Sequence, residues 1–233
     1  MAKKKIILSV HLTDKEQIWG IAYLLASIFL LPSALDYLCG LLPMPIGKSW
    51  FNFLYFTVNF LFIFMIFHGF FRRSLAYAGS HVGDFLVAVI LGAGFYWLTS
   101  WGISLLYGRY FPEFGNLNDG SISQMAGDHF WITAVGTVLL VPIAEEALHR
   151  GLVFGCLYQK SHAAAYILST IIFSSVHLMS YVGTYSTAHL ALAFVQYIPA
   201  GLALAWAYRK SGSIFAPILM HAMINGISIF SLR

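Results

Sequence analysis

Long runs of consecutive apolar residues alternate with short polar segments along most of the chain. A window of about 19 residues, the length that crosses the hydrocarbon core of a bilayer, separates seven candidate spans. They cover residues 18–42, 50–71, 84–107, 130–158, 163–178, 189–208 and 213–232. Because the apolar residues are consecutive and do not alternate with polar ones, helices are expected and not the strands of a closed barrel. The pattern predicts an all-α, polytopic transmembrane helical bundle with about seven spans, or eight if the long fourth run is split near Pro142.

The composition supports this fold class and excludes an ordinary soluble domain. Hydrophobic residues make up 59% of the 233 positions and charged residues 9%, against about 25% charged in a soluble domain. The formal net charge is +4, but the basic residues are scattered singly and in small groups, so no nucleic-acid partner is expected. The lipid bilayer is the expected surrounding. Cys39 and Cys156 lie in apolar runs at no metal-binding spacing and are expected to be free thiols.

Loop length and loop charge predict the orientation. Most loops are short, but residues 108–129 contain a proline and several glycine, asparagine and aspartate residues, so a long exposed loop is expected there. By the positive-inside rule, an excess of basic residues on one side predicts a cytoplasmic N-terminus and places the long loop outside. The basic side carries Lys3, Lys4, Lys5, Lys15, Arg72, Arg73, Lys160, Arg209 and Lys210, and the opposite side carries Lys48, Arg109 and Arg233.

The fourth predicted span carries four ionisable residues within six positions: Glu145, Glu146, His149 and Arg150. Such groups are costly at membrane depth unless they pair or line a wet cavity, so they indicate either function or a structural ion pair. Glu146 and Arg150 are four residues apart and can pair on one helical face, whereas Glu145 points about 100° away. A structural pair therefore leaves Glu145 without a partner. His149 is expected at an interface or in solvent.

Two later spans add further polar groups. The fifth ends in FSSVHL, with His177 near its outer end, and the seventh contains HAMING, in which His221 and Asn225 share one helical face. Each could be a satisfied core residue or an interhelical hydrogen-bonding group. At a rise of about 1.5 Å per residue, Glu145, His177 and Asn225 lie roughly 18–21 Å from the cytoplasmic ends of their spans, and His221 about 12 Å. A carboxylate, two imidazoles and a carboxamide that can converge in this way form a candidate hydrolytic set.

Three motifs in order resemble those of the CAAX-protease and bacteriocin-processing (CPBP, or Abi) family of intramembrane endopeptidases. They are EExxxR at Glu145, Glu146 and Arg150, FxxxH at Phe173 and His177, and HxxxN at His221 and Asn225. The segments RGLVFG and RKSGSIFAPILMHAMIN also resemble the usual surroundings of the first and last motifs. The resemblance covers about residues 134–229, and the first three spans carry no family signature. It divides the chain into N-terminal transmembrane helices with the outer loop, residues 1–129, and a CPBP-like catalytic core, residues 130–233.

The resemblance implies hydrolysis of a peptide bond in a membrane-associated peptide or protein precursor. Glu145 with His177 would hold and deprotonate a water, and His221 with Asn225 would donate hydrogen bonds to the oxyanion. Glu146 and Arg150 would be the supporting pair that fixes Glu145. The short chain without further domains is similar to the bacterial members, so a bacterial cytoplasmic membrane is the expected location.

A metal cofactor and other functions stay open at this point. Glu145, His177 and His221 could supply three ligands to a divalent metal such as zinc and leave a fourth position for water. The sequence has no HExxH helix, and a glutamate mechanism without a cofactor is favoured. A non-catalytic membrane scaffold or bacteriocin-immunity protein would instead bind a partner through the same polar cluster. A proton-coupled transporter would use it as a relay, but the sequence lacks the internal repeats that many transporters have. No oligomeric state is predicted.

Overall fold

The computed structural model describes residues 8–231, and every regular element within them is helical. Lys3, Lys4, Lys5 and Arg233, which entered the orientation prediction, lie outside the described residues. Five helices are long and apolar enough to cross a membrane, and a bent pair at the start can form a sixth span. A further apolar helix near the C-terminus is shorter. The predicted all-α helical bundle is therefore confirmed.

The helices follow the predicted apolar runs closely. In chain order they are α1 (Asp14–Phe29), α2 (Leu31–Gly40), α3 (Lys48–Ser80), α4 (Val82–Tyr110), α5 (Leu117–Val135), α6 (Val141–Glu146), α7 (Gly155–Tyr158), α8 (His162–Leu178), α9 (Thr187–Ser211) and α10 (Phe215–Ser231). Two π-helical segments, η1 (Gly136–Leu140) and η2 (Ala147–Phe154), join the part of α5 after His129 to α6 and α7 in one continuous rod. A 3-10 turn, η3 (Met179–Tyr181), follows α8.

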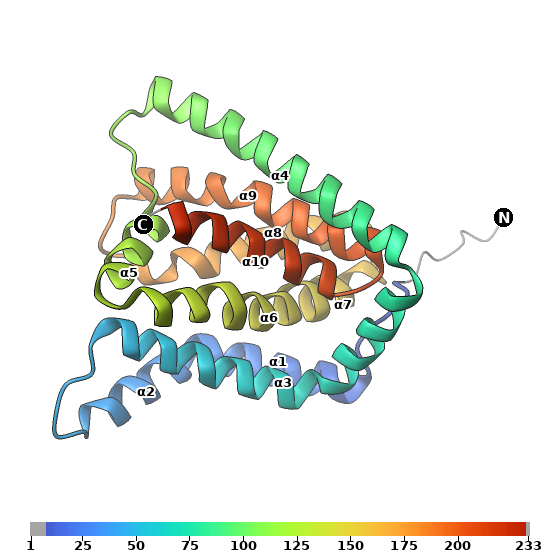
Figure 1. The fold of residues 1–233 in the computed structure, drawn as a ribbon, viewed down its shortest axis with the longest axis horizontal. Helices are drawn as coiled ribbons and strands as arrows, with labels where there is room; N and C mark the ends of the chain where they lie inside the picture. Colours follow the sequence, from blue (N-terminus) through green and yellow to red (C-terminus); the bar gives the residue numbers. More distant parts are fainter. Residues whose placement is uncertain (1–7, 232–233) are drawn as a thin grey trace.

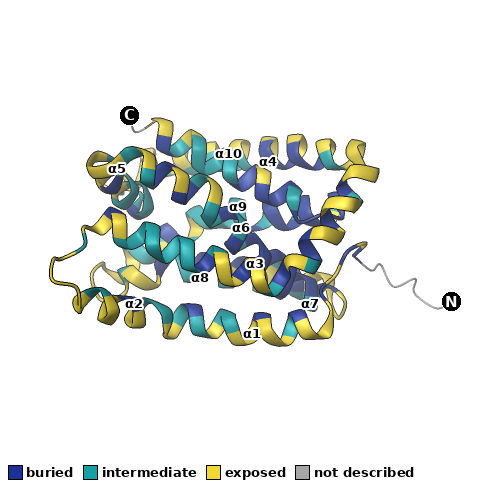
Figure 2. Ribbon diagram, turned by 60° about the horizontal axis from the view of Figure 1, so that its bottom comes forward, coloured by how far each residue is buried: buried dark blue, intermediate teal, exposed yellow. Residues whose placement is uncertain are grey.

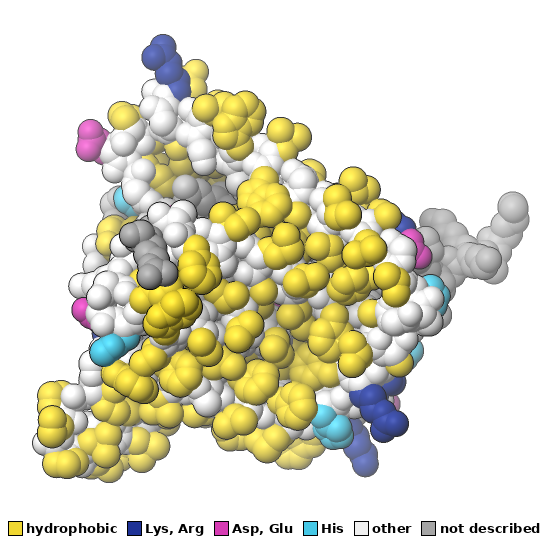
Figure 3. Space-filling model, viewed as in Figure 1, with side chains coloured by type: hydrophobic (Ala, Val, Ile, Leu, Met, Phe, Trp, Pro, Cys, Tyr) yellow, Lys and Arg dark blue, Asp and Glu magenta, His cyan; other side chains and the backbone are white. Residues whose placement is uncertain are grey.

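The helices lie side by side along the long axis of the molecule, with α6 and α10 between α3 and α4 (Figure 1). The most buried residues line the inner faces of α6, η2 and α9, whereas the outer faces of α1 and α2 are exposed (Figure 2). Many of the exposed side chains are large and apolar, and they cover the broad face between the two ends (Figure 3). A surface of this kind fits a hydrocarbon surrounding and would be poorly hydrated in water.

Charged and polar contacts gather at the end of the bundle where α1, α4 and α10 begin (Figure 1). Arg73 near the end of α3 pairs with Glu16 at the start of α1, with 2.6 Å between Nη2 and Oε2. Lys210 at the end of α9 pairs with Asp84 in the first turn of α4. These lysine and arginine residues belong to the side that the positive-inside rule assigns to the cytoplasm.

The predicted first span is divided in two. Helices α1 and α2 meet at Leu30 with a bend of 52°. Pro32 lies in the first turn of α2, where its missing N–H costs no helical hydrogen bond. The same proline could not stand deeper in a straight helix without removing a bond, so the chain bends just before it.

The long loop predicted at residues 108–129 is wrong in its second half. The loop ends at Asn116, and the chain is helical from Leu117. The Asn116 side chain accepts hydrogen bonds from the backbone N–H groups of Asn118 and Asp119, at 2.9 and 3.2 Å. Asparagine and aspartate favour helix N-caps as well as turns, and here the cap prevails. A kink at His129 (φ −146°, ψ 79°) separates this additional helix from the predicted fourth span.

A tight turn sets the direction of α10. Gly212 ends α9 in the left-handed conformation (φ 68°), which glycine adopts without strain. The hydroxyl of Ser213 then donates to the carbonyl of Ser74 on α3, at 2.9 Å. The turn therefore folds α10 back along α9 and fixes it to α3, so that the histidine and asparagine of α10 face the middle of the bundle.

Candidate active site

Pro142 shapes the rod that carries the acidic pair. It has no N–H, and the N–H of Val141 reaches back five residues to the carbonyl of Gly136, which makes the wide turn of η1. The carbonyl of Thr137 is then available to a side chain from another helix. The side-chain amide of Asn225, on α10, donates a hydrogen bond to this carbonyl, with 2.8 Å between Nδ2 and the carbonyl oxygen. This bond also orients the amide, because only the NH2 group can donate to a carbonyl.

A buried ion pair lies one turn further along the rod. Arg150 Nη1 is 2.9 Å from Glu146 Oε1, and the two side chains are 1% and 0% exposed. The other terminal nitrogen of Arg150 makes long hydrogen bonds to the carbonyls of Ala200 and Gly201 on α9, at 3.4 and 3.3 Å. At the same point α9 packs closely against α8, because Gly201 has no side chain; a Cβ there would lie 2.6 Å from Thr170 of α8. The arginine thus joins the rod to α9.

The same carboxylate oxygen also holds His221. Its Nδ1 lies 2.8 Å from Glu146 Oε1. A carboxylate can only accept, so Nδ1 carries the proton, and Nε2 donates only when the ring is doubly protonated. The supporting pair expected to fix Glu145 therefore makes its direct contact with His221 instead, because Glu146 and Glu145 point to different faces of the rod.

Glu145 faces His177 across the gap between α6 and α8. Glu145 Oε2 is 3.5 Å from His177 Nε2, which is too long for a direct hydrogen bond and short enough for one water to contact both. His177 Nδ1 donates to the carbonyl of Phe173, at 2.8 Å, which leaves Nε2 of the neutral ring as an acceptor. Two acceptors side by side suit a water that gives up a proton. Glu145 is not within a described contact of His221.

Phe173, the first residue of the FxxxH motif, lies at the centre of the cluster. The Arg150 guanidinium carbon lies 4.3 Å from the centre of its ring, a cation–π contact. The rings of His149, His177 and His221 surround it at centroid distances of 5.3, 4.4 and 6.2 Å. Phe173 thus spaces the polar groups and keeps water from the ion pair.

A polar cavity of about 340 Å³ opens beside the cluster. His177, His221 and Asn225 line it together with Tyr197 and Gln196 of α9, and its walls also come from α4 and the start of α5. We name it the main cavity. Its size suits a short peptide segment or a small ligand. Glu145 does not line this cavity, so the four predicted residues do not surround one pocket; Glu145 reaches it only through His177.

The predicted ligand set for a metal is not assembled. Among residues 8–231, no group of three or more histidine, cysteine, aspartate or glutamate side chains is arranged to hold a metal ion. Glu145 and His177 lie together, but the Nδ1 of His221 is directed to Glu146, whose Oε1 also binds Arg150. These positions do not fit one tetrahedral centre built from Glu145, His177 and His221.

The sequence predicts His149 at the membrane interface or in solvent, but the residue is buried. Its side chain packs edge-on against Phe173 and the residue is 3% exposed. It lines a second, smaller cavity together with Glu145, and with Tyr55 and Asn59 of α3. Sequence reasoning did not single out Tyr55 or Asn59. The sequence did hold an indication that Asn59 has a role, because an asparagine within the apolar run 50–71 is costly at membrane depth unless it finds a partner.

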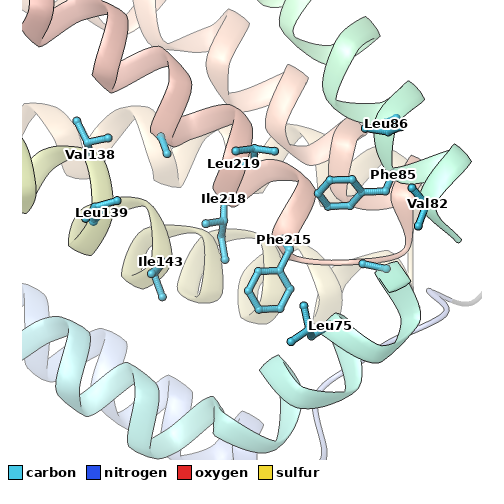
Figure 4. Close-up of a pocket in the computed structure, with 12 residues that line it drawn as sticks. Leu75, Val82, Phe85, Leu86, Val138, Leu139, Ile143, Phe215, Ile218 and Leu219 are labelled. Carbon is cyan, nitrogen blue, oxygen red and sulfur yellow. The ribbon is translucent and has the colours of Figure 1, made fainter. Parts of the chain in front are cut away.

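A separate hollow in the structure carries no polar chemistry. An apolar groove of about 590 Å³ lies between α3, α4, α6 and α10, next to the point where α3 ends and α4 begins (Figure 1). Figure 4 shows its walls, which include Leu75, Phe85, Ile143, Phe215 and Leu219. No ionisable side chain lines it. The groove therefore offers contact to apolar chains but no group for acid–base work.

Comparisons with known proteins agree with the motifs. Residues 127–227 match the family model "Type II CAAX prenyl endopeptidase Rce1-like". The "Putative membrane peptidase YdiL" of Bacillus subtilis (strain 168) is 33% identical over 100 residues, which cover 40% of this chain and 36% of that protein. The "UPF0177 protein YxdF" of Lactococcus lactis subsp. lactis (strain IL1403) is 26% identical over 87 residues, which cover 37% of this chain and 42% of that protein. No solved structure gives a significant match.

The matched region thus spans well under half the length of these relatives. The apolar helices and the similarity to a protein named as a membrane peptidase identify an integral membrane protein. The matched segment includes α6, η2, α8 and most of α10, which carry all of the candidate site residues. The resemblance that the motifs indicated is confirmed for residues 127–227, which match the Rce1-like family of type II CAAX prenyl endopeptidases.

Proposed function

We propose that this protein is an intramembrane endopeptidase that hydrolyses a peptide bond in a membrane-associated peptide or protein precursor. The observation that carries the proposal is the Glu145–His177 contact of 3.5 Å at the edge of the polar main cavity. A carboxylate and an imidazole acceptor on adjacent helices are suited to hold one water and take its proton. The family match over residues 127–227 and the name of the B. subtilis relative support the same reaction class.

The proposed reaction uses each residue at a defined atom. The peptide lies in the main cavity with its carbonyl carbon facing Glu145 and His177. Glu145 takes a proton from the water, whose oxygen bonds to the carbonyl carbon, and the proton then passes to the leaving nitrogen as the C–N bond breaks. The second amide N–H of Asn225 and the Nε2–H of cationic His221 donate to the oxyanion. Glu146 accepts a hydrogen bond from Nδ1 of His221 and so orients the ring, which means that it acts through His221.

The proposal needs no metal cofactor, since these residues supply the base and the oxyanion donors themselves. Because the Glu146–Arg150 pair is fully buried, its electrostatic contact is stronger than it would be in solution. We further propose that the protein lies in a bacterial cytoplasmic membrane with the start of α1 on the cytoplasmic side, as the distribution of basic residues favours. The main cavity then opens towards the outer side, where α5 begins and α10 ends.

The test compares cleavage by the wild-type protein and by Glu145→Gln in lipid vesicles. Prenylated CAAX peptides and unmodified membrane-associated peptides serve as candidate substrates, with products identified by mass spectrometry. Glu113→Gln, in the exposed loop before α5, is the matched control because it removes a carboxylate of the same size. We expect cleavage by the wild type and by Glu113→Gln and none by Glu145→Gln.

The competing function is a scaffold or immunity protein that binds a partner through the same cluster. Cleavage that persists in Glu145→Gln would contradict the proposed mechanism. If no candidate is cleaved by the wild type, and partner binding or immunity survives in Glu145→Gln, His177→Ala and His221→Ala, the scaffold account replaces the peptidase account.

A further inference from the structure

The smaller cavity is lined by Glu145, which does not line the main cavity. Its volume is about 90 Å³, and it is bounded by α1, α3, α6, η2 and α8. Polar groups reach it from both sides: Glu145 and His149 from the rod, Tyr55 and Asn59 from α3, and Ser27 from α1. A water needs about 10–15 Å³ of free space, so several waters fit. We name it the side cavity.

Two residues that line the side cavity each carry a buried polar atom with no hydrogen-bond partner within residues 8–231. The two atoms are Glu145 Oε2 and Nδ1 of His149. His149 is 97% buried, with only 3% of its surface exposed, and a polar group so deeply buried is nearly always satisfied by protein or by ordered water. The side cavity is the space that both residues share, and it is large enough for water.

The wall opposite Glu145 is held in place by its own hydrogen bonds. The Tyr23 hydroxyl of α1 donates to Asn59 Oδ1, at 2.9 Å, and Asn59 Nδ2 donates to the carbonyl of Tyr55, at 2.9 Å. The Tyr55 hydroxyl donates to the carbonyl of Ser27 on α1, at 3.4 Å. Asn59 keeps one N–H and Tyr55 keeps its oxygen lone pairs, so the wall presents both a donor and acceptors of fixed orientation.

We propose that the side cavity is the water compartment of the enzyme, from which water is delivered to Glu145 and oriented there by Asn59, Tyr55 and His149 as positioning residues. The inference rests on the proposed peptidase function and deepens it. It assigns work to α1 and α3, which lie outside the matched residues 127–227. It also uses His149, to which the three motifs assign no role.

The two cavities divide the reaction between them. Glu145 and His177 stand where they meet, because Glu145 lines the side cavity and His177 lines the main cavity. A peptide that fills the main cavity displaces the water there, yet each turnover consumes one water. Water that enters from the side cavity replaces it without the peptide having to leave.

Two variants test the positioning residues. Asn59→Leu removes the amide at similar volume, and His149→Phe keeps a ring against Phe173 without nitrogen atoms. Both lower kcat by about tenfold or more, the effect of losing roughly one hydrogen bond at the reacting water, and leave KM unchanged. Gln196→Leu, on the wall of the main cavity, is the matched control and raises KM instead. His149→Gln returns a polar group to the side cavity and recovers part of kcat.

A second measurement does not depend on activity or on the fold of those variants. Ser27→Cys and Ser169→Cys are made in protein whose Cys39 and Cys156 are replaced by serine. Ser27 lines the side cavity at 5% exposure, whereas Ser169 of α8 is 1% exposed and lines neither cavity. We expect a small, water-soluble methanethiosulfonate reagent to modify Cys at position 27 much faster than Cys at position 169.

The outcomes separate this inference from the proposed function. If Asn59→Leu and His149→Phe keep the wild-type kcat while Glu145→Gln abolishes cleavage, the water compartment is wrong and the peptidase stands. Equal modification rates at positions 27 and 169 overturn the water compartment as well. If Glu145→Gln cleaves as fast as the wild type, the proposed function itself fails.

Discussion

The buried pair between Glu146 and Arg150 can be measured by a double-mutant cycle. Glu146→Leu removes the short ion pair and leaves the Arg150 charge with two long carbonyl contacts and the Phe173 ring, and Arg150→Met leaves the Glu146 charge with the His221 contact. Removing one partner of a fully buried pair costs about 3–5 kcal/mol, because the other charge stays in a medium of low polarity. The double variant buries neither charge. It is therefore expected to lose at least about 3 kcal/mol less than the sum of the single variants.

The assay is unfolding by sodium dodecyl sulfate in mixed micelles, followed by tryptophan fluorescence. Arg73→Met is the control, since its pair with Glu16 is 41% exposed on the arginine side and should cost only about 0–1 kcal/mol. The double variant should recover stability without recovering cleavage, because His221 no longer has an acceptor for Nδ1. If the two single losses add in the double variant, the pair is not coupled and this reasoning is refuted.

Three further results are expected. Gly201→Ala destabilises the bundle by about 1–3 kcal/mol through the 2.6 Å approach to the Thr170 methyl group, and Thr170→Ser relieves part of the loss in the same unfolding assay. Pro142→Ala restores a backbone N–H to the rod, and this N–H competes with the Asn225 amide for the Thr137 carbonyl, so cleavage falls while the unfolding midpoint is kept. If the variant acts through Asn225, Asn225→Leu alone and the combined Pro142→Ala/Asn225→Leu variant lose the same amount of cleavage activity. Cleavage in vesicles persists after prolonged treatment with a zinc chelator, and loss of activity that added zinc restores would overturn the cofactor-free mechanism.

Much of the fold follows from the sequence because the apolar runs are long. A run of about 20 apolar residues has only one way to satisfy its backbone in hydrocarbon, so helix positions are set locally. The errors occurred where a residue has two local uses. Asn116 serves as a helix cap where a turn was expected, and Pro32 starts a new helix where a continuous span was expected.

The candidate site was only partly predictable, for a reason of geometry. Spacing along a helix places Glu146 and Arg150 together, since both lie on one element. Spacing along one helix cannot place Glu145 relative to His221, because their separation depends on how α10 is rotated about its axis against the rod. The π-helical segments change that relation further, because each wide turn rotates the residues that follow it. His149, Tyr55 and Asn59 became relevant only when α3 and η2 were seen to share the side cavity.

The central claim is that Glu145 and His177 activate one water together. Its most direct test is the single-turnover cleavage rate of the wild type, Glu145→Gln, His177→Ala and the double variant, with an identified substrate in vesicles. Two groups that act as a unit are strongly non-additive, so each single variant should lose nearly all of the rate and the double variant little more. A Glu145→Gln protein that cleaves at the wild-type rate, or single losses that multiply fully in the double variant, would contradict the account.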